Sequence, residues 1–191
     1  MRGDQNKCMH RVGFWVYPAP MTWNDRFLVL FDCCAAAYMA GDHDFENYYR
    51  AEDLEFLAEI GYQPREFFDF VEDFCGEGTP SISTALLIAA VRRDYFWVVQ
   101  KGKVSDKVLT RDEVPSFGEV LNGMTYLPRL IAKGRAKLRG ELHPDLMFGC
   151  GGDRNFLQKH GDLHPADFLR RLWAAGEDDQ KIAAWIAGQA S

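Results

Sequence analysis

Apolar residues recur at helical spacing along most of the chain, which predicts a mostly α-helical protein. The clearest stripe lies in residues 127–138 and ends before Gly140, a residue type typical of helix ends. Gly134 lies on the same face of this helix. Because a glycine inside a helix costs about 1 kcal/mol relative to alanine, we expect a second helix to approach Gly134 closely. The stripe consists of Leu127, Leu130, Ile131 and Leu138.

The pattern occurs twice, at an offset of about 100 residues. Residues 53–61 (DLEFLAEIG) match residues 153–161 (DRNFLQKHG), and residues 21–26 (MTWNDR) match residues 124–129 (MTYLPR). The alternative is two unrelated groups of helices that share common start and end residues. The sequence predicts a tandem duplication of a small helical domain, whose long first helices pack against each other. Its parts are a diverged first repeat over 1–93, a linker over 94–123 and a second repeat over 124–191.

The linker carries a short β pattern. Residues 95–109 contain two apolar stretches around Lys101-Gly102-Lys103, which we interpret as a short hairpin between the repeats. The alternative is that Tyr95 to Val99 extend the preceding helix. Ser116 and Glu119 have the spacing of a capping box and predict a short helix in the linker.

The second half of the chain carries long ordered motifs. Residues 127–140 read LPRLIAKGRAKLRG, residues 148–157 read FGCGGDRNFL, and residues 179–186 read DQKIAAWI. Over residues 95–188 the chain resembles a bacterial family known only as a domain of unknown function, DUF5069. The resemblance implies a small soluble helical domain and no settled activity. The first half resembles a diverged copy, in which Leu30 stands at the place of Lys133.

Charge and composition exclude several classes of protein. The net charge is -6, so no global positive field attracts nucleic acid or an anionic membrane. Residues 1–95 hold 16 acidic and eight basic residues, whereas residues 96–191 hold 12 acidic and 14 basic residues. The most apolar stretch, residues 27–40, has 14 residues and is shorter than the roughly 20 that span a bilayer.

The cysteines and the N-terminal residues indicate a compartment. Five cysteines without C-x-x-C spacing fit a reduced, cytoplasmic setting better than a disulfide framework. The polar residues 1–7 are not followed by a signal-peptide pattern, so we expect no secretory signal.

The helix predicted after Tyr126 carries five bases and no acid. At 100° per residue, Arg129, Lys133 and Lys137 lie on one side, where two or three of them can hold a phosphate or carboxylate. The alternatives are a solvated face or ion pairs with the acidic first half. We expect the ligand in a cleft between the repeats. The candidate binding residues are Arg129, Lys133, Arg135, Tyr126, Arg26 and Trp23.

Three residues are candidates for catalysis. Asp32 lies in an apolar helix, where a carboxylate is costly to bury unless paired, and the alignment of the repeats makes Arg135 its expected partner. The alternative is that Asp32 acts as a general acid or base. Cys150 lies in a glycine-rich turn before a helix, a setting that favours a reactive thiol, although a small residue at a tight turn explains it as well. Asp153 is an acid/base or orienting candidate three residues later.

Two classes of function fit these features. The first is a protein that binds, and in one version transforms, a small anionic or aromatic metabolite between the repeats; whether it is an enzyme stays open. The second is a non-catalytic helical module that docks a protein partner. A ligand site predicts a pocket of about 300 Å³ or more with converging polar groups, whereas a docking module predicts an exposed apolar patch rimmed by charge. We expect no cofactor and no metal, and a homodimer stays open.

Overall fold

The computed structural model describes residues 21–189, so Cys8 and the first 20 residues of the predicted first repeat lie outside it. The described residues are mostly helical, which confirms the predicted fold class. The α-helices are α1 (Trp23–Met39), α2 (Ala51–Glu59), α3 (Pro64–Glu77), α4 (Ile82–Val98), α5 (Leu127–Arg139), α6 (Gly151–Lys159), α7 (Pro165–Ala175) and α8 (Asp179–Ala187). A 3-10 helix, η1 (Phe45–Asn47), precedes α2, and two short strands, β1 (Val120–Leu121) and β2 (Met124–Thr125), precede α5.

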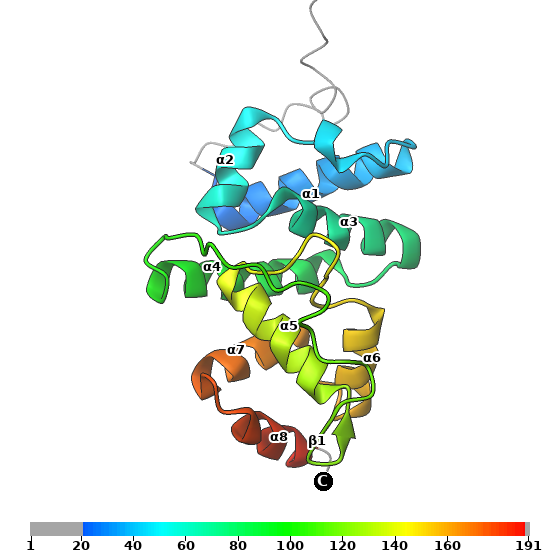
Figure 1. The fold of residues 1–191 in the computed structure, drawn as a ribbon. Helices are drawn as coiled ribbons and strands as arrows, with labels where there is room; N and C mark the ends of the chain where they lie inside the picture. The colour runs from blue at the N-terminus through cyan, green and yellow to red at the C-terminus, as the bar shows by residue number, and fades with distance from the viewer. Residues whose placement is uncertain (1–20, 190–191) are drawn as a thin grey trace, which may run out of the picture.

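Helix α4 lies in the middle of the molecule, with α1, α2 and α3 on one side and α5 to α8 on the other (Figure 1). It packs on α1 from the first half and on α5 and α7 from the second. Ala85 and Ala89 are fully buried in α4, and such small side chains let neighbouring helices come close. The prediction that the two long first helices form the interface is therefore wrong, because α1 packs mainly on α3 and α5 mainly on α7. The duplication itself stays a prediction.

The close approach expected at Gly134 is confirmed. A Cβ atom at this position would collide with Cδ1 of Leu172 and lie 3.4 Å from both Phe148 and Phe168. Leu172 and Phe168 belong to α7, so the glycine sets how tightly α5 packs on that helix.

The linker differs from its predicted form. Tyr95 to Val98 belong to α4, so the alternative of a helix extension holds for them and the hairpin over residues 95–109 is wrong. A hairpin does lie between the two halves, but it pairs Val120 with Thr125 through a turn at Asn122-Gly123. Both turn residues have positive φ, 49° and 79°, which favours the Asn-Gly pair.

The short linker helix predicted at residues 116–119 is also absent; this segment forms a turn. The backbone N–H of Ser116 does donate to the Glu119 carboxylate, at 2.9 Å. This bond accounts for the capping-box spacing, but no helix follows because β1 begins at once.

A buried ion pair joins the two halves. Nζ of Lys137 in α5 lies 2.6 Å from Glu66 in α3 and 3.9 Å from the ring centroid of Tyr62. Burial lowers the pKa of Lys137, whereas the Glu66 charge opposes this change. For Lys137 the structure therefore shows an ion pair with the first half rather than an open anion grip. Among residues 21–189, no helix has the length and apolar character needed to cross a membrane.

Candidate functional site

The start of α6 places a thiol beside an exposed helix end. Cys150 is the N-cap residue, and its side chain makes no capping hydrogen bond to the first turn. Gly151 and Gly152 follow and are exposed, while the thiol itself is half-buried. The N-terminal amides of a helix carry partial positive charge and favour anions. This turn can therefore receive a negatively charged group from solvent next to the thiol.

Asp153 is the third residue of α6, and its carboxylate is fully buried. It accepts a hydrogen bond of 2.7 Å from the Tyr126 hydroxyl and one of 2.8 Å from the backbone N–H of Gly149. Nζ of Lys133 donates to the same carboxylate at 2.8 Å. A buried carboxylate is costly unless it is paired and hydrogen-bonded, and Asp153 meets both conditions. Both carboxylate oxygens accept hydrogen bonds, so Asp153 holds Tyr126, Lys133 and the backbone of Gly149 in position.

Lys133 links the carboxylate to the thiol. Its side chain is 3% exposed, and its Nζ lies 2.8 Å from Asp153 and 3.3 Å from Sγ of Cys150. Asp153 fixes the position of this ammonium group, because Nζ lies 2.8 Å from both carboxylate oxygens while it remains within hydrogen-bond reach of the sulfur. The thiol therefore lies 3.3 Å from a buried, hydrogen-bonded cation and stands at the start of α6.

Tyr126 contributes the fourth side chain of this group, and its backbone conformation is unusual. It is the N-cap residue of α5 and has φ of 78°, in the left-handed region that bulky side chains rarely adopt. Such conformations cost of order 1–3 kcal/mol and occur often at functional sites. Burial raises the pKa of Tyr126, and the charge of Asp153 raises it further, so the hydroxyl stays protonated and donates.

Arg129 borders the cluster through an aromatic contact. Its guanidinium donates to the carbonyl of Pro115 at 2.9 Å and stands 4.2 Å from the ring centroid of Phe117. Phe117 is exposed and lies 5.9 Å from the ring of Tyr126. Arg129 therefore brings a second positive charge to the outer edge of this group of residues. We call Tyr126, Lys133, Cys150 and Asp153 the α6 cluster.

The other predicted site residues lie elsewhere. Arg135 binds Asp179 at 2.5 Å and the carbonyl of Gly176 at 3.0 Å. Arg26 in α1 pairs with Glu59 at 3.0 Å. The ring of Trp23 lies 5.1 Å from the guanidinium of Arg93. The structure thus joins Tyr126, Lys133, Cys150 and Asp153, with Arg129 at their edge, and separates Arg135, Arg26 and Trp23 from them.

The predicted ion pair between Asp32 and Arg135 is wrong. Asp32 lies on the exposed face of α1 and, within residues 21–189, its carboxylate has no ion-pair partner. The apolar run around Asp32 covers one face with core residues and leaves the other in solvent, so the carboxylate needs no counter-ion.

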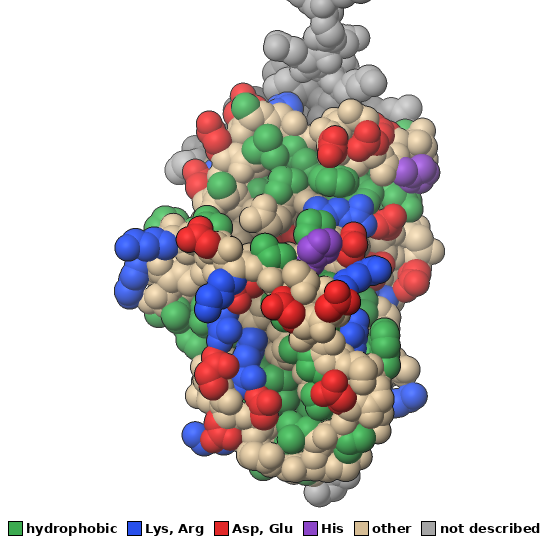
Figure 2. All heavy atoms as spheres, in the orientation of Figure 1, with side chains coloured by type: hydrophobic (Ala, Val, Ile, Leu, Met, Phe, Trp, Pro, Cys, Tyr) green, Lys and Arg blue, Asp and Glu red, His purple; other side chains and the backbone are tan. Residues whose placement is uncertain are grey.

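The basic residues of α5 are matched by acids over much of the surface. Figure 2 shows blue and red side chains interspersed on the face that α5 crosses, not a separate basic field. Arg139 pairs with Glu177, and Arg135 pairs with Glu177 and Asp179. An open anion grip along the whole helix is therefore not available.

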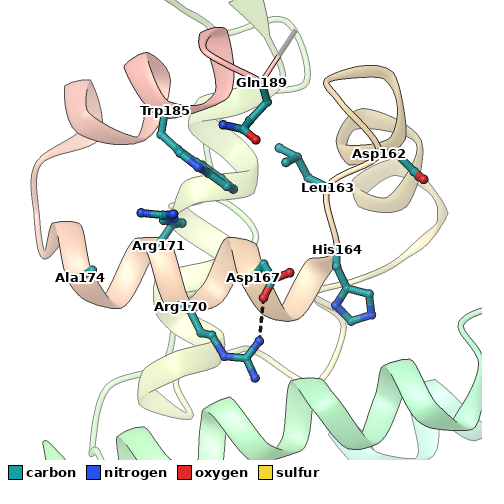
Figure 3. Close-up of a pocket in the computed structure, with 9 residues that line it drawn as sticks. All are labelled: Asp162, Leu163, His164, Asp167, Arg170, Arg171, Ala174, Trp185 and Gln189. Carbon is teal, nitrogen blue, oxygen red and sulfur yellow. Dashed lines mark hydrogen bonds and ion pairs between the residues drawn. The ribbon is translucent and has the colours of Figure 1, made fainter.

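Two cavities lie outside the α6 cluster. The larger has a volume of about 580 Å³ and lies between α7, α8 and the connection that precedes α7 (Figure 3). The smaller, of about 300 Å³, lies between α3 and the segment 144–147, and Arg65, Asp69 and Arg111 are among its lining residues. A cavity between the two halves thus exists, but the predicted ligand residues do not line it. No cluster of metal-ligating side chains occurs in residues 21–189.

Sequence reasoning missed three parts of the α6 cluster's surroundings. Gly149 contributes a backbone N–H, which no side-chain pattern reveals. Gly152 faces the hydroxyl of Tyr126, and a Cβ there would lie 2.9 Å from it and 4.0 Å from Sγ of Cys150. The two glycines around Cys150 were a usable signal, since close backbone approach is a common reason for glycine. No sequence pattern indicated that Phe117 lies beside the cluster.

Comparison with known proteins gives one match. No curated protein and no solved structure matches the chain. The resemblance inferred from the motifs is confirmed for residues 111–191, which include all four residues of the α6 cluster. Residues 111–191 match the family described as Domain of unknown function (DUF5069).

Proposed function

We propose that the protein binds a small molecule with an anionic group at the first turn of α6, beside the thiol of Cys150. The observation that carries this proposal is the buried ammonium of Lys133, held 2.8 Å from Asp153 and 3.3 Å from Sγ of Cys150. A buried lysine and carboxylate are costly to maintain, so packing alone does not explain why they lie beneath a half-buried thiol.

Each residue has a distinct role in this proposal. The amides at the exposed turn of Gly151 and Gly152 receive the anionic group, and Arg129 adds positive charge at the edge. Asp153 and Tyr126 position Lys133 and do not contact the ligand. Cys150 is the nucleophile available to an electrophilic ligand, so a reaction at this site would pass through its sulfur. The site lies within the second half, not in a cleft between the repeats.

Two glycines give a matched test of this site. Gly152→Ala places a methyl group beside the Tyr126 hydroxyl and Sγ of Cys150, whereas a Cβ at Gly151 would meet only Arg154, at 3.9 Å. Both glycines are exposed in the first turn of α6, so both variants gain similar helix propensity. Lys133→Ala is less suitable, because it leaves Asp153 without its cation.

The experiment is a thermal-shift screen of the protein and both variants with inorganic phosphate, acetate and phosphorylated or carboxylated metabolites. A ligand at 100 times its dissociation constant stabilises the folded state by about 2.7 kcal/mol. We expect at least one anion to raise the melting temperature of the wild-type protein and of Gly151→Ala, but not of Gly152→Ala. If no anion does so, or if both variants respond alike, the proposal fails.

A second candidate function is docking of a protein, and one observation favours it. Trp97, Val98 and Val99 at the end of α4 are 49%, 56% and 44% exposed, beside Lys101. Exposed apolar side chains rimmed by charge are typical of interaction surfaces. A second copy of the chain is the partner to test first: sedimentation of the wild-type protein should show concentration-dependent association that Val98→Asp removes. A monomer at every concentration would reject self-docking.

We also propose that the protein is located in the cytoplasm. An accessible thiol at Cys150 persists where thiols are kept reduced, which supports a cytoplasmic protein. Fractionation of cells that express a tagged chain tests this directly.

A further inference from the structure

We propose that the 580 Å³ cavity between α7 and α8 is a second ligand site, which takes a small planar aromatic acid. The volume falls within the range of about 300–1,000 Å³ in which small molecules usually bind. The cavity is separate from the α6 cluster, since none of the four cluster residues lines it. Figure 3 shows its walls: Arg171 from α7, Trp185 and Gln189 from α8 and its end, and Leu163 from the preceding connection.

The aromatic part of the ligand is inferred from Trp185. The indole is half-buried, and its inner side is supported by Phe168, whose ring centroid lies 6.5 Å away. Leu163 points toward the indole from the opposite wall (Figure 3). A flat ring between an indole and a leucine side chain buries apolar surface on both faces, and aromatic pairs add about 0.5–1.5 kcal/mol beyond their burial.

The acidic part of the ligand is inferred from the two arginines of the cavity. Arg170 binds the carboxylate of Asp167 at 2.7 Å, so its charge is already compensated. Arg171 stands 5.3 Å from the ring centroid of Trp185 and, within residues 21–189, has no carboxylate partner. Asp162 also borders the cavity, but its side chain points away from Trp185 and Arg171 (Figure 3). A guanidinium offers paired donors that match a carboxylate.

A tight contact lies beside Gln189, at the end of α8. Gly161 has φ of 104°, and a Cβ there would lie 3.0 Å from Cβ of Gln189. The connection before α7 therefore packs directly on the end of α8. This contact holds the amide of Gln189 at the cavity, where it can hydrogen-bond a polar substituent on the ring.

The experiment uses benzoate, nicotinate and indole-3-acetate as probes, with benzyl alcohol as the uncharged counterpart of benzoate. Saturation-transfer NMR detects binding through the ring protons, and titration gives the dissociation constant. We expect at least one acid to bind and benzyl alcohol to bind more weakly. Arg171→Gln should weaken the acid about tenfold or more, because it removes a charge-assisted contact. Arg170→Gln, a change at the neighbouring paired arginine, should weaken binding less than Arg171→Gln does.

Two further variants test whether the acid binds in this cavity. Trp185→Leu should abolish the saturation transfer, and Arg171→Gln keeps the test decisive if that variant does not fold. Gly152→Ala, which alters the α6 cluster, should bind the acid as well as the wild-type protein does. The proposal is overturned if none of the three acids binds, if both arginine variants weaken binding equally, or if Gly152→Ala removes it.

Discussion

Helices α2 and α6 begin in a similar way, but the aspartate in the first turn of each has different surroundings. Each is nine residues long, and each has an aspartate as its third residue, Asp53 in α2 and Asp153 in α6. Asp53 accepts hydrogen bonds of 3.0 Å from the backbone N–H and from Nε of Arg50, and that arginine is mostly exposed. Asp153 instead accepts from Tyr126, Lys133 and Gly149 and is fully buried.

Under the predicted duplication, the difference comes from the helix that precedes each one. In the predicted alignment of the halves, Leu30 of α1 takes the place of Lys133 of α5, and Leu30 lies in the apolar core. With a leucine at this place, the aspartate of α2 pairs only with Arg50, which is mostly exposed. In α5 this place holds Lys133, which forms a buried pair with the aspartate of α6. An aspartate at the start of a helix is therefore structural by default, and it joins a site only when a second element supplies a buried cation.

The largest expected effect is loss of the buried carboxylate. Asp153→Ala leaves the ammonium of Lys133 buried without a partner, which should lower the free energy of unfolding by about 3–5 kcal/mol. Asp53→Ala removes a pair whose arginine is mostly exposed and should cost about 1 kcal/mol or less. Urea denaturation of both variants measures the difference. Lys133→Leu with Asp153→Ala, which removes both charges of the buried pair, should recover much of the loss. Equal costs at the two aspartates would refute the comparison.

The next effect concerns how the long helices pack. Gly134 of α5 stands opposite Leu172, whereas Phe31, at the aligned place in α1, packs against Phe67 with ring centroids 5.9 Å apart. Gly134→Ala should destabilise the protein by about 1–3 kcal/mol through overpacking, despite its better helix propensity. Thermal unfolding measures this change. A stabilised Gly134→Ala variant would show that α7 can move away without cost.

Tyr126→Phe should have a smaller effect than Asp153→Ala. It removes one donor from the buried carboxylate but leaves Lys133 and Gly149 in place, so we expect a loss of about 1–2 kcal/mol in the free energy of unfolding. Urea denaturation again provides the measurement. A cost near that of Asp153→Ala would mean that the hydroxyl, and not Lys133, is the main partner of Asp153.

The last prediction is a pH dependence of the first half. Burial raises the pKa of Asp69 to about 7, against the opposing charge of Arg65. The folded state therefore binds a proton that the unfolded state has already lost. Stability relative to Asp69→Asn should fall as the pH rises from about 4 to 7, by at most about 1.4 kcal/mol per unit, and should then level off. Denaturation of both proteins across this range tests the sign; parallel pH profiles would contradict it.

The sequence predicted the helices and part of the site, for identifiable reasons. The apolar stripe of α5 and the close contact at Gly134 depend on local spacing and glycine geometry, so both were visible. Tyr126, Lys133, Cys150 and Asp153 were each recognised as candidates, since charged or reactive side chains stand out in an apolar or glycine-rich context. Their convergence was not predicted, because it depends on how α6 packs beside α5.

The errors have one physical cause. The apolar neighbours of Asp32 predict a buried carboxylate, but a helix with one core face can expose any single position. The symmetry of the repeats predicts that the long first helices pair, whereas α4 occupies the space between the halves. Local patterns determine elements; which faces meet is decided by long-range packing.

The most direct test is site-resolved alkylation of the free thiols with iodoacetamide, read by mass spectrometry in the presence and absence of phosphate. Burial raises the pKa of Cys34 to about 12 and also raises that of Cys75, so these two thiols serve as internal references. We predict that Cys150 reacts fastest, that phosphate slows Cys150 alone, and that Gly152→Ala, but not Gly151→Ala, removes this protection. Alkylation of Cys150 at the rate of Cys75, with no effect of phosphate, would contradict a ligand site at the start of α6.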